Sequence, residues 1–317
     1  MENEPSIITV GLAPAWDITC IGRNIEWGKH QNIDQQSILP AGKALNISRA
    51  LSWIGQPSKA AGLWGADDFD KMLSFSRASW PLITIEMTVV HGETRKNITI
   101  VDTAQKREMH LRNKTEFISS KVLRQLKSDL GKIVKMGNIC VFAGAMPEGE
   151  KLGIVLDIMK SCHNAGAKIV LDTSGHALKT IIETGLVWLI KPNVSELCKL
   201  FNIENEDNPA FLIENGKKLL SKAENILISR GKNGAIFLNN QGIWQSKAIE
   251  NRDIIGTVGC GDYLLAGFLK GWNDTKREDC ALSTAIKLAT AKAWGWTQDT
   301  FKPEVMEQVQ IKISRSK

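Results

Sequence analysis

The chain has 317 residues, of which 43% are hydrophobic and 23% charged, with 26 glycines and 9 prolines. Such proportions belong to a globular protein and exclude a disordered chain, a collagen-like repeat and a disulfide scaffold. The net charge of +6 is spread along the chain, so we expect no nucleic-acid partner. The six cysteines lack C-x-x-C spacing, and no apolar run approaches the roughly 20 residues of a membrane-spanning helix. We therefore expect a cytoplasmic protein with no membrane partner.

The first half of the chain predicts two kinds of strand. Ile7–Val10 is apolar throughout and predicts a core strand, whereas residues 17–21, 83–90 and 97–101 alternate apolar and polar side chains. Alternation is typical of strands with one exposed face. We expect these strands to form a small sheet, inserted at about residues 15–39 and 83–112, that projects from the main domain and covers a cleft. Residues 121–135 predict an amphipathic helix with basic exposed faces.

From about residue 138 onward, short apolar runs alternate with helical stretches. Strands are predicted at 138–142, 168–172, 187–190, 225–229 and 235–238, and helices at 151–162, 176–183, 194–201 and after Asp262. This alternation favours a mainly parallel sheet with helices on both faces. We find no repeats and no linker, so residues 1–317 are expected to form one α/β domain.

The most informative stretch is a glycine-rich turn, GTVGCGDYLLAGF at 256–268, which runs into a helical pattern. Backbone amides of such a turn can point at one anion, and the helix amino terminus adds partial positive charge. Asp262, in the first turn, would then lie within reach of an attacking hydroxyl, which makes it a candidate general base. The alternative is a tight turn in which Asp262 only caps the helix. The spacing fits neither the dinucleotide fingerprint nor a Walker A motif.

This turn resembles the carboxy-terminal G-A-G-D signature of the PfkB/ribokinase family of sugar kinases. AGKALNISRALSWIG at 41–55 resembles the amino-terminal signature, KPNVSEL at 191–197 resembles the N-x-x-E motif, and SRGKNGA at 229–235 resembles the nucleotide-side loop. The motifs occur in the family's order and span about residues 8–295. The resemblance implies a ribokinase-like three-layer α/β/α sandwich with a small β-sheet lid.

The resemblance also implies roles for individual residues. The anion hole for the transferred phosphoryl group falls on Gly259, Cys260 and Gly261, with Asp262 as the base. ATP is the implied donor, and the residues implied to bind it are Lys191, Asn193, Ser229, Gly231, Gly234 and Gly256. Cys260 stands where the family has a small residue, and we expect it to act through its backbone amide rather than as a thiolate.

Asn193 and Glu196 lie one helical turn apart, which suits a hydrated Mg²⁺ bound largely through water and nucleotide phosphates. The same spacing fits a capping box, in which the two residues only close the helix start. The resemblance favours the metal.

The substrate end resembles the phosphosugar branch of the family. Asp17 is expected to bind sugar hydroxyls, and Lys43, Arg95 and Asn97 to hold the phosphate that the substrate already carries. Gly42 and Asn46 complete the expected substrate set. A hairpin turn with an exposed Arg95 is the structural alternative.

Several residues depart from the family pattern on this side of the site. Alanine stands at 13, 41, 44 and 145, where the subgroup has Asn, Gly, Gly and Ser, and REMHLRNK at 107–114 replaces T-E-x-N-x-x-G. The base, the anion hole and the N-x-x-E pair are intact. We therefore expect an ATP-dependent kinase of a ketohexose phosphate, with fructose 1-phosphate the leading acceptor and tagatose 6-phosphate or fructose 6-phosphate the alternatives.

Two further alternatives are a kinase of an unphosphorylated sugar or nucleoside and a non-catalytic nucleotide or sugar-phosphate sensor. Family members commonly dimerise through their lids, and the alternating lid strands of this chain offer an edge that two copies could share. We therefore expect a homodimer.

Overall fold

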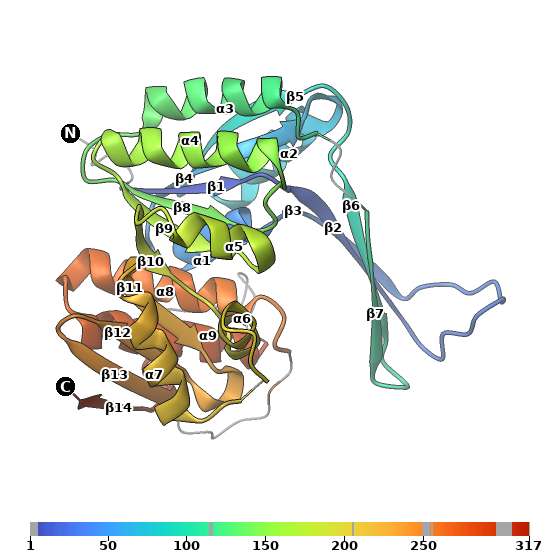
Figure 1. Cartoon of the computed structure of the whole chain (residues 1–317). Helices are drawn as coiled ribbons and strands as arrows, with labels where there is room; N and C mark the ends of the chain where they lie inside the picture. The colour runs from blue at the N-terminus through green and yellow to red at the C-terminus, as the bar shows by residue number, and fades with distance from the viewer. Residues whose placement is uncertain are drawn as a thin grey trace.

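The computed structural model describes residues 6–113, 117–204, 206–248, 254, 256–295 and 306–316. Lys114, the last residue of the REMHLRNK stretch, lies outside these ranges. A large sheet forms the centre of the molecule (Figure 1). Its strands follow the spatial order β14 (Ile311–Ser316), β13 (Gly242–Ala248), β12 (Ala235–Asn239), β11 (Ala223–Ser229), β10 (Val187–Ile190), β9 (Lys168–Asp172), β8 (Ile139–Ala143), β1 (Ile7–Gly11), β4 (Ser58–Gly65) and β5 (Ile83–Val90).

The sheet is parallel from β5 to β11 and antiparallel from β11 to β14. Helices cover both faces. One face carries α3 (Ser120–Ile133), α4 (Glu150–Asn164), α5 (Gly175–Ile182), α6 (Val194–Leu200) and α7 (Pro209–Leu219), and the other carries α1 (Lys43–Trp53), α8 (Cys260–Thr275) and α9 (Glu278–Ala293). The predicted three-layer arrangement around a mainly parallel sheet is confirmed.

Strand side chains alternate between two buried cores, because successive residues of a strand point to opposite faces. In β8, Cys140 and Phe142 pack in the core under α3–α7, whereas Ile139 and Val141 pack in the core under α1, α8 and α9. A third, smaller cluster includes Trp64 and Met72 and lies beside α2 (Phe69–Ser79), which follows a 3₁₀ turn at Ala66–Asp68. None of the helices in the described segments combines the length and apolar character needed to cross a membrane.

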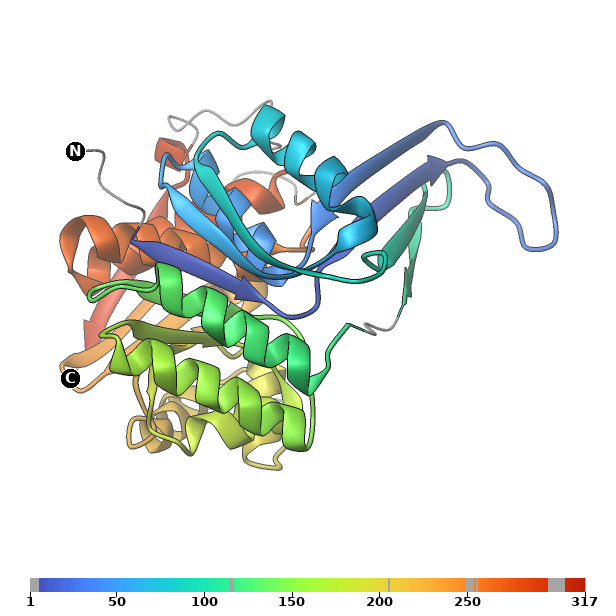
Figure 2. The ribbon, with the colours of Figure 1, turned by 90° about the horizontal axis from the view of Figure 1, so that it is seen from above.

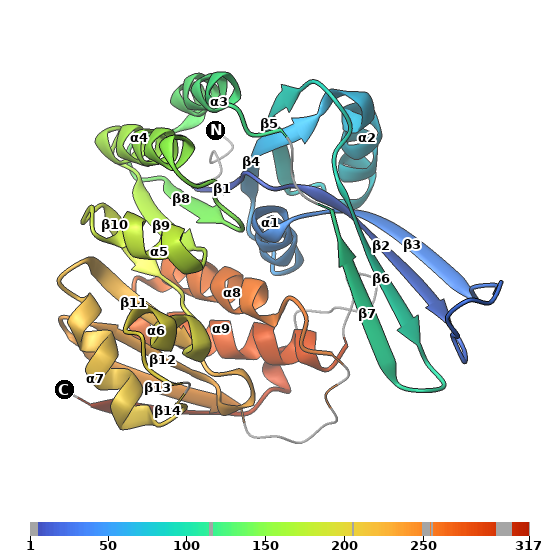
Figure 3. The same ribbon diagram turned by 45° about the vertical axis from the view of Figure 1, so that its right-hand side comes forward.

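A separate four-stranded sheet projects from the body (Figures 1 and 3). Its spatial order is β3 (Gln35–Ala41), β2 (Ala15–Gly22), β6 (Lys96–Asp102) and β7 (Arg107–Arg112), and we call it the lid. The lid strands predicted at 17–21 and 97–101 lie within it. The prediction for 83–90 was wrong, because this segment is β5 and pairs in parallel with β4 at the edge of the large sheet. Apolar and polar residues alternate in β5 because it is an edge strand whose two faces are buried to different extents. A lid strand shows the same sequence pattern.

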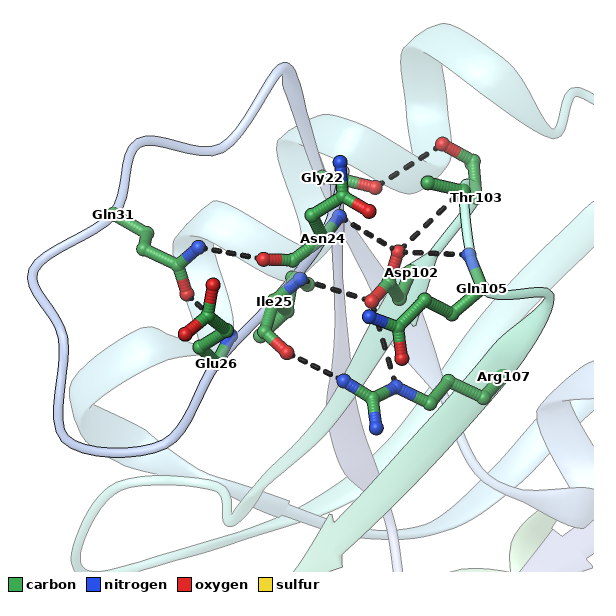
Figure 4. A network of polar contacts seen from close by, with 10 residues as sticks. Gly22, Asn24, Ile25, Glu26, Gln31, Asp102, Thr103, Gln105 and Arg107 are labelled. Carbon is green, nitrogen blue, oxygen red and sulfur yellow. Dashed lines mark hydrogen bonds and ion pairs between the residues drawn. The ribbon is translucent and has the colours of Figure 1, made fainter.

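The tip of the lid is a loop over residues 23–34, which joins β2 to β3 far from the body (Figure 2). Asp102, at the end of β6, is 2% exposed and anchors the base of this loop. Its carboxylate accepts hydrogen bonds from the backbone amides of Asn24 and Ile25, both at 2.9 Å, and from those of Ala104 and Gln105 (Figure 4). Burial alone would raise the pKa of Asp102, but these amides hold it below its usual value.

Candidate active site

A cavity of about 860 Å³ extends from the lid to the carboxyl ends of the parallel strands. Ligands of open α/β sheets bind at this edge, because the loops that leave the strands converge there. The structure brings nearly all of the predicted site residues to the cavity wall. They are Asp17, Gly42, Lys43, Asn46, Arg95, Asn97, Lys191, Asn193, Glu196, Ser229, Gly231, Gly234, Gly259, Cys260, Gly261 and Asp262.

Gly256 is the predicted residue that is missing from this wall. Its amide donates to the carbonyl of Ala293 at 3.3 Å, and its carbonyl faces the thiol of Cys260 at 3.7 Å. The structure therefore gives Gly256 a part in holding the glycine turn and does not place it in the nucleotide-binding part of the cavity.

The glycine turn ends in the first turn of α8. Gly259 is the helix N-cap and has φ +80°, a left-handed conformation that favours glycine. A Cβ on Gly261 would lie 3.4 Å from Nζ of Lys191, so the backbone passes close to a buried ammonium group. The amides of Cys260 and Asp262 donate to the carbonyls of Thr257 and Gly259, whereas those of Gly259 and Gly261 have no backbone partner in the described part of the chain. Gly259, Gly261 and Lys191 all line the cavity. The arrangement suits an anion such as a transferred phosphoryl group.

Asp262 lies in this turn and is 5% exposed. Asn46 of α1 donates to its Oδ2 from Nδ2 at 3.2 Å. Burial, and then the nearby carboxylate of Asp172, raise the pKa of Asp262 to about 6, against the opposing charges of Lys43 and Lys191. A carboxylate poised near neutral pH and open to a cavity can accept a proton from a hydroxyl, as a general base does.

Asp172, at the carboxyl end of β9, is a central residue of the site that was not among the predicted site residues. It is fully buried, and it accepts from Nζ of Lys43 at 2.8 Å and faces Nζ of Lys191 at 3.3 Å. Desolvation lowers the pKa of Lys43, but Asp172 outweighs this effect and raises it. The sequence signal that could have indicated Asp172 was the predicted strand KIVLD, which ends in a carboxylate. The two lysine partners of Asp172 lie far from it in sequence and cannot be predicted from spacing.

Cys260 shows no sign of an activated thiolate. Burial raises the pKa of its thiol, and the charge of Lys292 opposes this only in part. A helix amino terminus with nearby cations would be expected to lower the pKa of a reactive cysteine. The backbone amide of Cys260 donates to the carbonyl of Thr257 at 3.2 Å, so its expected role through this amide stays a prediction.

The lid end of the cavity carries Asp17, Asn97 and Arg95. Oδ1 of Asp17 accepts from Nδ2 of Asn97 at 2.8 Å, which ties β2 to β6. Arg95 donates to three backbone carbonyls, from Nε to Pro14 at 3.0 Å, from NH2 to Ala13 at 3.1 Å and from NH1 to Asn113 at 3.0 Å. These bonds fix the plane of the guanidinium, so Arg95 is not the freely exposed residue of a hairpin turn.

At the opposite end, Asn193 and Glu196 form the capping box that the sequence left as an alternative. Oδ1 of Asn193 accepts from the amide of Glu196 at 2.8 Å, and Oε2 of Glu196 accepts from the amide of Asn193 at 2.9 Å. Both residues also line the cavity, and Oε1 of Glu196 takes no part in the cap. The pair therefore caps α6 and presents a carboxylate oxygen to the cavity.

Gly234 fixes the loop on this side, between β11 and β12. It has φ +84°, and a Cβ there would lie 2.0 Å from the carbonyl oxygen of Ser246 in β13. Ser229, at the end of β11, donates its amide to the carbonyl of Pro192 at 3.0 Å, which joins the two predicted nucleotide-binding segments. Gly231 has φ +54° with open space around it.

The chain is similar in sequence and fold to a family of known proteins. The family model described as pfkB family carbohydrate kinase matches residues 6–294. The chain is 27% identical over 320 residues to a 1-phosphofructokinase of Haemophilus influenzae, covering 96% of this chain and 98% of the relative. It is 28% identical over 270 residues to a tagatose-6-phosphate kinase of Staphylococcus epidermidis, covering 84% of each chain.

Among solved structures, phosphofructokinase-2 from Escherichia coli in complex with fructose-6-phosphate superimposes with a TM-score of 0.86 at 20% identity. The alignment covers 96% of this chain and 98% of that one. The shared fold extends over the body and the lid, and the family match includes the glycine turn, Asp262 and the Asn193–Glu196 pair. The chain belongs to the pfkB family of carbohydrate kinases.

Proposed function

We propose that the protein transfers the γ-phosphoryl group of ATP to a hydroxyl of a ketohexose phosphate, with fructose 1-phosphate as the first candidate acceptor. The observation that carries this proposal is the position of Asp262, a buried carboxylate with a pKa of about 6 beside the glycine turn. The relatives named 1-phosphofructokinase and tagatose-6-phosphate kinase support the acceptor class.

In the proposed reaction, Asp262 takes the proton of the attacking hydroxyl, and Asn46 orients its carboxylate. Charge that develops on the transferred group meets the amides of Gly259 and Gly261 and the ammonium of Lys191, while the amide of Cys260 donates to the carbonyl of Thr257 within the turn. Little covalent chemistry falls to the protein in phosphoryl transfer, so this prearranged charge accounts for most of the catalysis. A well-placed base adds about 10²- to 10⁴-fold.

The donor is proposed to lie between Gly231–Gly234 and α6, with its phosphates directed toward the glycine turn. Glu196 would contribute its free carboxylate oxygen to a hydrated Mg²⁺, since this ion prefers few protein ligands together with waters and nucleotide phosphates. The ion would neutralise phosphate charge during transfer. The capping hydrogen bonds of Glu196 fix its orientation for this task.

The test is ADP release from Mg·ATP with fructose 1-phosphate, fructose 6-phosphate, tagatose 6-phosphate, fructose and ribose, run beside Asp262→Asn. We expect turnover on one phosphosugar and a loss of at least about 10²-fold in kcat for the variant. Asp262→Asn should fold and be more stable at pH 7 by up to about 3 kcal/mol, because ionising a carboxylate of raised pKa destabilises the fold above its unfolded pKa. The proposal would be refuted if the wild type released no ADP with any of these sugars, or if Asp262→Asn kept full activity.

The lid suggests a homodimer. Register places Ile38, Ile18, Ile98 and Leu111 in one row across all four lid strands, on the face opposite to Asp17 and Asn97. Ile38 is 38% and Leu111 46% exposed. An apolar row of this kind is stabilised when a second lid covers it.

A further inference from the structure

The strand register of the lid brings polar residues from three strands into one row. Asp17 of β2 pairs with Asn97 of β6, and Asn97 pairs with Arg112 of β7. A second row, two residues along, joins Thr19, Thr99 and His110. Directly paired residues point to the same side of a sheet, so both rows share one face. We call Asp17, Asn97, Arg112, Thr19, Thr99 and His110 the polar lid face.

Most of the polar lid face lines the cavity, including Arg112 and His110. These two residues fall in the REMHLRNK stretch, where the chain departs from the family pattern and where His110 occupies the position of an asparagine. No motif of the family assigns a role to Arg112. Its position in the row places it beside residues that the sequence already linked to the substrate.

Arg112 and Arg95 put two positive charges at this end of the cavity. Burial lowers the pKa of Arg95, the charge of Asp17 opposes this change, and the nearby charge of Arg112 adds to it. In the described part of the chain, no carboxylate lies at ion-pair distance from either guanidinium. Two like charges close together repel each other, and an anion bound between them removes the repulsion.

Lys43, the other cation predicted for this task, is held elsewhere. Its ammonium lies 2.8 Å from Asp172, in the group that surrounds Asp262. It therefore belongs to the phosphoryl-transfer end of the cavity. Among the described residues that line the lid end of the cavity, Arg95 and Arg112 are the remaining cations.

Asn97 carries an unfilled acceptor at the same place. Its Nδ2 donates to Asp17, and its Oδ1 is buried and has no hydrogen-bond partner among the residues that the structure describes. A buried acceptor without a donor costs about 1–3 kcal/mol, so a donor is expected when the site is occupied. A sugar hydroxyl can donate to this oxygen, whereas a phosphate dianion would be repelled by it.

We propose that Arg112, together with Arg95, binds the phosphate that the sugar acceptor already carries, while Asp17 and Asn97 bind its hydroxyls. Arginine suits this task because its planar fork can donate two parallel hydrogen bonds to one phosphate. Arg112 is then a specificity-determining residue that separates a sugar phosphate from the bare sugar. The inference rests on the proposed function in taking the acceptor to be a phosphosugar.

The test is calorimetric titration of fructose 1-phosphate, fructose 6-phosphate, tagatose 6-phosphate and fructose into wild type, Arg112→Gln, Arg112→Lys and Arg23→Gln. Arg23 is a matched control, because it is a lid arginine in an exposed ion pair with Asp34, away from the cavity. We expect Arg112→Gln to weaken the best phosphosugar about 10- to 100-fold and to leave fructose within threefold. The affinity of Arg112→Lys for the phosphosugar should lie between those of wild type and Arg112→Gln, since lysine keeps the charge but lacks the planar guanidinium. Arg23→Gln should bind like wild type.

Binding without turnover separates this inference from the proposed function. If Arg112→Gln loses phosphosugar affinity but wild type releases no ADP, the kinase proposal fails and the role of Arg112 stands. If wild type turns over a phosphosugar and Arg112→Gln has the same KM and Kd, the kinase proposal stands and the role of Arg112 is refuted. Equal losses for fructose and phosphosugar, or no phosphosugar binding by wild type, also refute it. Thermal melting confirms that each variant is folded.

Discussion

Asp262 and Asp172 form an unequal pair of carboxylates at the centre of the site. Asp172 is fully buried between two lysines, whereas Asp262 faces the cavity with one amide donor. Two carboxylates whose surroundings differ in this way separate in role. Asp172 positions Lys43 and Lys191, and Asp262 is left near neutrality to exchange a proton.

The rate should follow the ionisation of Asp262. We expect kcat/KM to rise as pH increases through about 6, because burial and then Asp172 raise the pKa of this base to that value. Asp172→Asn removes a negative charge that raises the pKa of Asp262, so the acid limb of the profile should shift to lower pH. Profiles of kcat/KM from pH 5 to 9 make the measurement.

Asp157→Asn is the matched control, because this exposed aspartate on α4 lies 3.7 Å from Lys127, its one ion-pair partner within the described ranges. It should leave the acid limb unchanged. Asp172→Asn should also cost roughly 3 kcal/mol of stability, since one partner of a buried ion pair is lost. An acid limb that stays in place in Asp172→Asn would contradict the coupling between the two carboxylates.

Sequence indicated Asp262, the proposed base, more readily than it indicated the residues around it. Asp262 follows a glycine turn that adjacent residues encode, so its place at the start of a helix is predictable from the local sequence. The link between Lys43 and Asp172 spans 129 positions and exists only because β9 and the start of α1 meet at one edge of the sheet. For the same reason, the row Asp17–Asn97–Arg112 depends on strand register that spacing does not fix.

Secondary-structure elements were predicted well where one physical pattern applied. β9 and β10 match their predicted bounds, and α4 and α6 differ by one or two residues at their ends. β5 was assigned to the wrong sheet, because alternating apolar and polar residues indicate a strand with one exposed face but do not indicate which sheet the strand joins. β4, although strongly buried, was not predicted, since its small residues and glycines give a weak strand signal.

Two glycines of one loop provide a paired test of backbone constraint. Gly234→Ala would place a Cβ 2.0 Å from the carbonyl of Ser246, so we expect β12 and β13 to separate locally, with a loss of about 2 kcal/mol or more and weaker ATP binding. Gly231→Ala meets no atom within 4 Å and should cost only about 1 kcal/mol for its positive φ. Urea unfolding of both variants gives the comparison; equal losses would contradict it.

The lid tip offers a test of a single anchor. In the wild type, four backbone amides donate to the two carboxylate oxygens of Asp102, whereas Asp102→Asn keeps only one acceptor oxygen. We therefore expect the 23–34 loop to open more often in the variant (Figure 4). Limited proteolysis should cut this loop several-fold faster than in wild type. Asp34→Asn, which removes only an exposed ion pair, should be cut at the wild-type rate. An unchanged rate in Asp102→Asn would show that other contacts hold the loop.

The molecule consists of a body with large buried cores and a lid that buries little apolar surface. The body has two large apolar cores, one on each side of its sheet, whereas the lid strands are mostly half-buried or exposed. A thin four-stranded sheet is usually stabilised by packing one face against another layer. A second lid could supply that layer.

We expect a dimeric mass by light scattering at micromolar concentration. Ile38→Glu should shift the protein toward monomer, because it places a charge in the exposed apolar row of the lid. Val89→Glu is the matched control, since Val89 is 46% exposed but lies on β5 of the body. A monomeric wild type, or equal effects of the two variants, would refute assembly through the lid.

The position of β1 bears on how the chain is made. This strand begins at residue 7 yet lies between β4 and β8, and its β8 edge pairs with residues 139–142. While the ribosome synthesises the intervening segments, β1, β4 and β5 can already pair, but the apolar edge of β1 stays open. An open apolar edge invites pairing with other chains. Until β8 emerges from the ribosome, a nascent chain therefore carries an open apolar strand edge that a chaperone could protect.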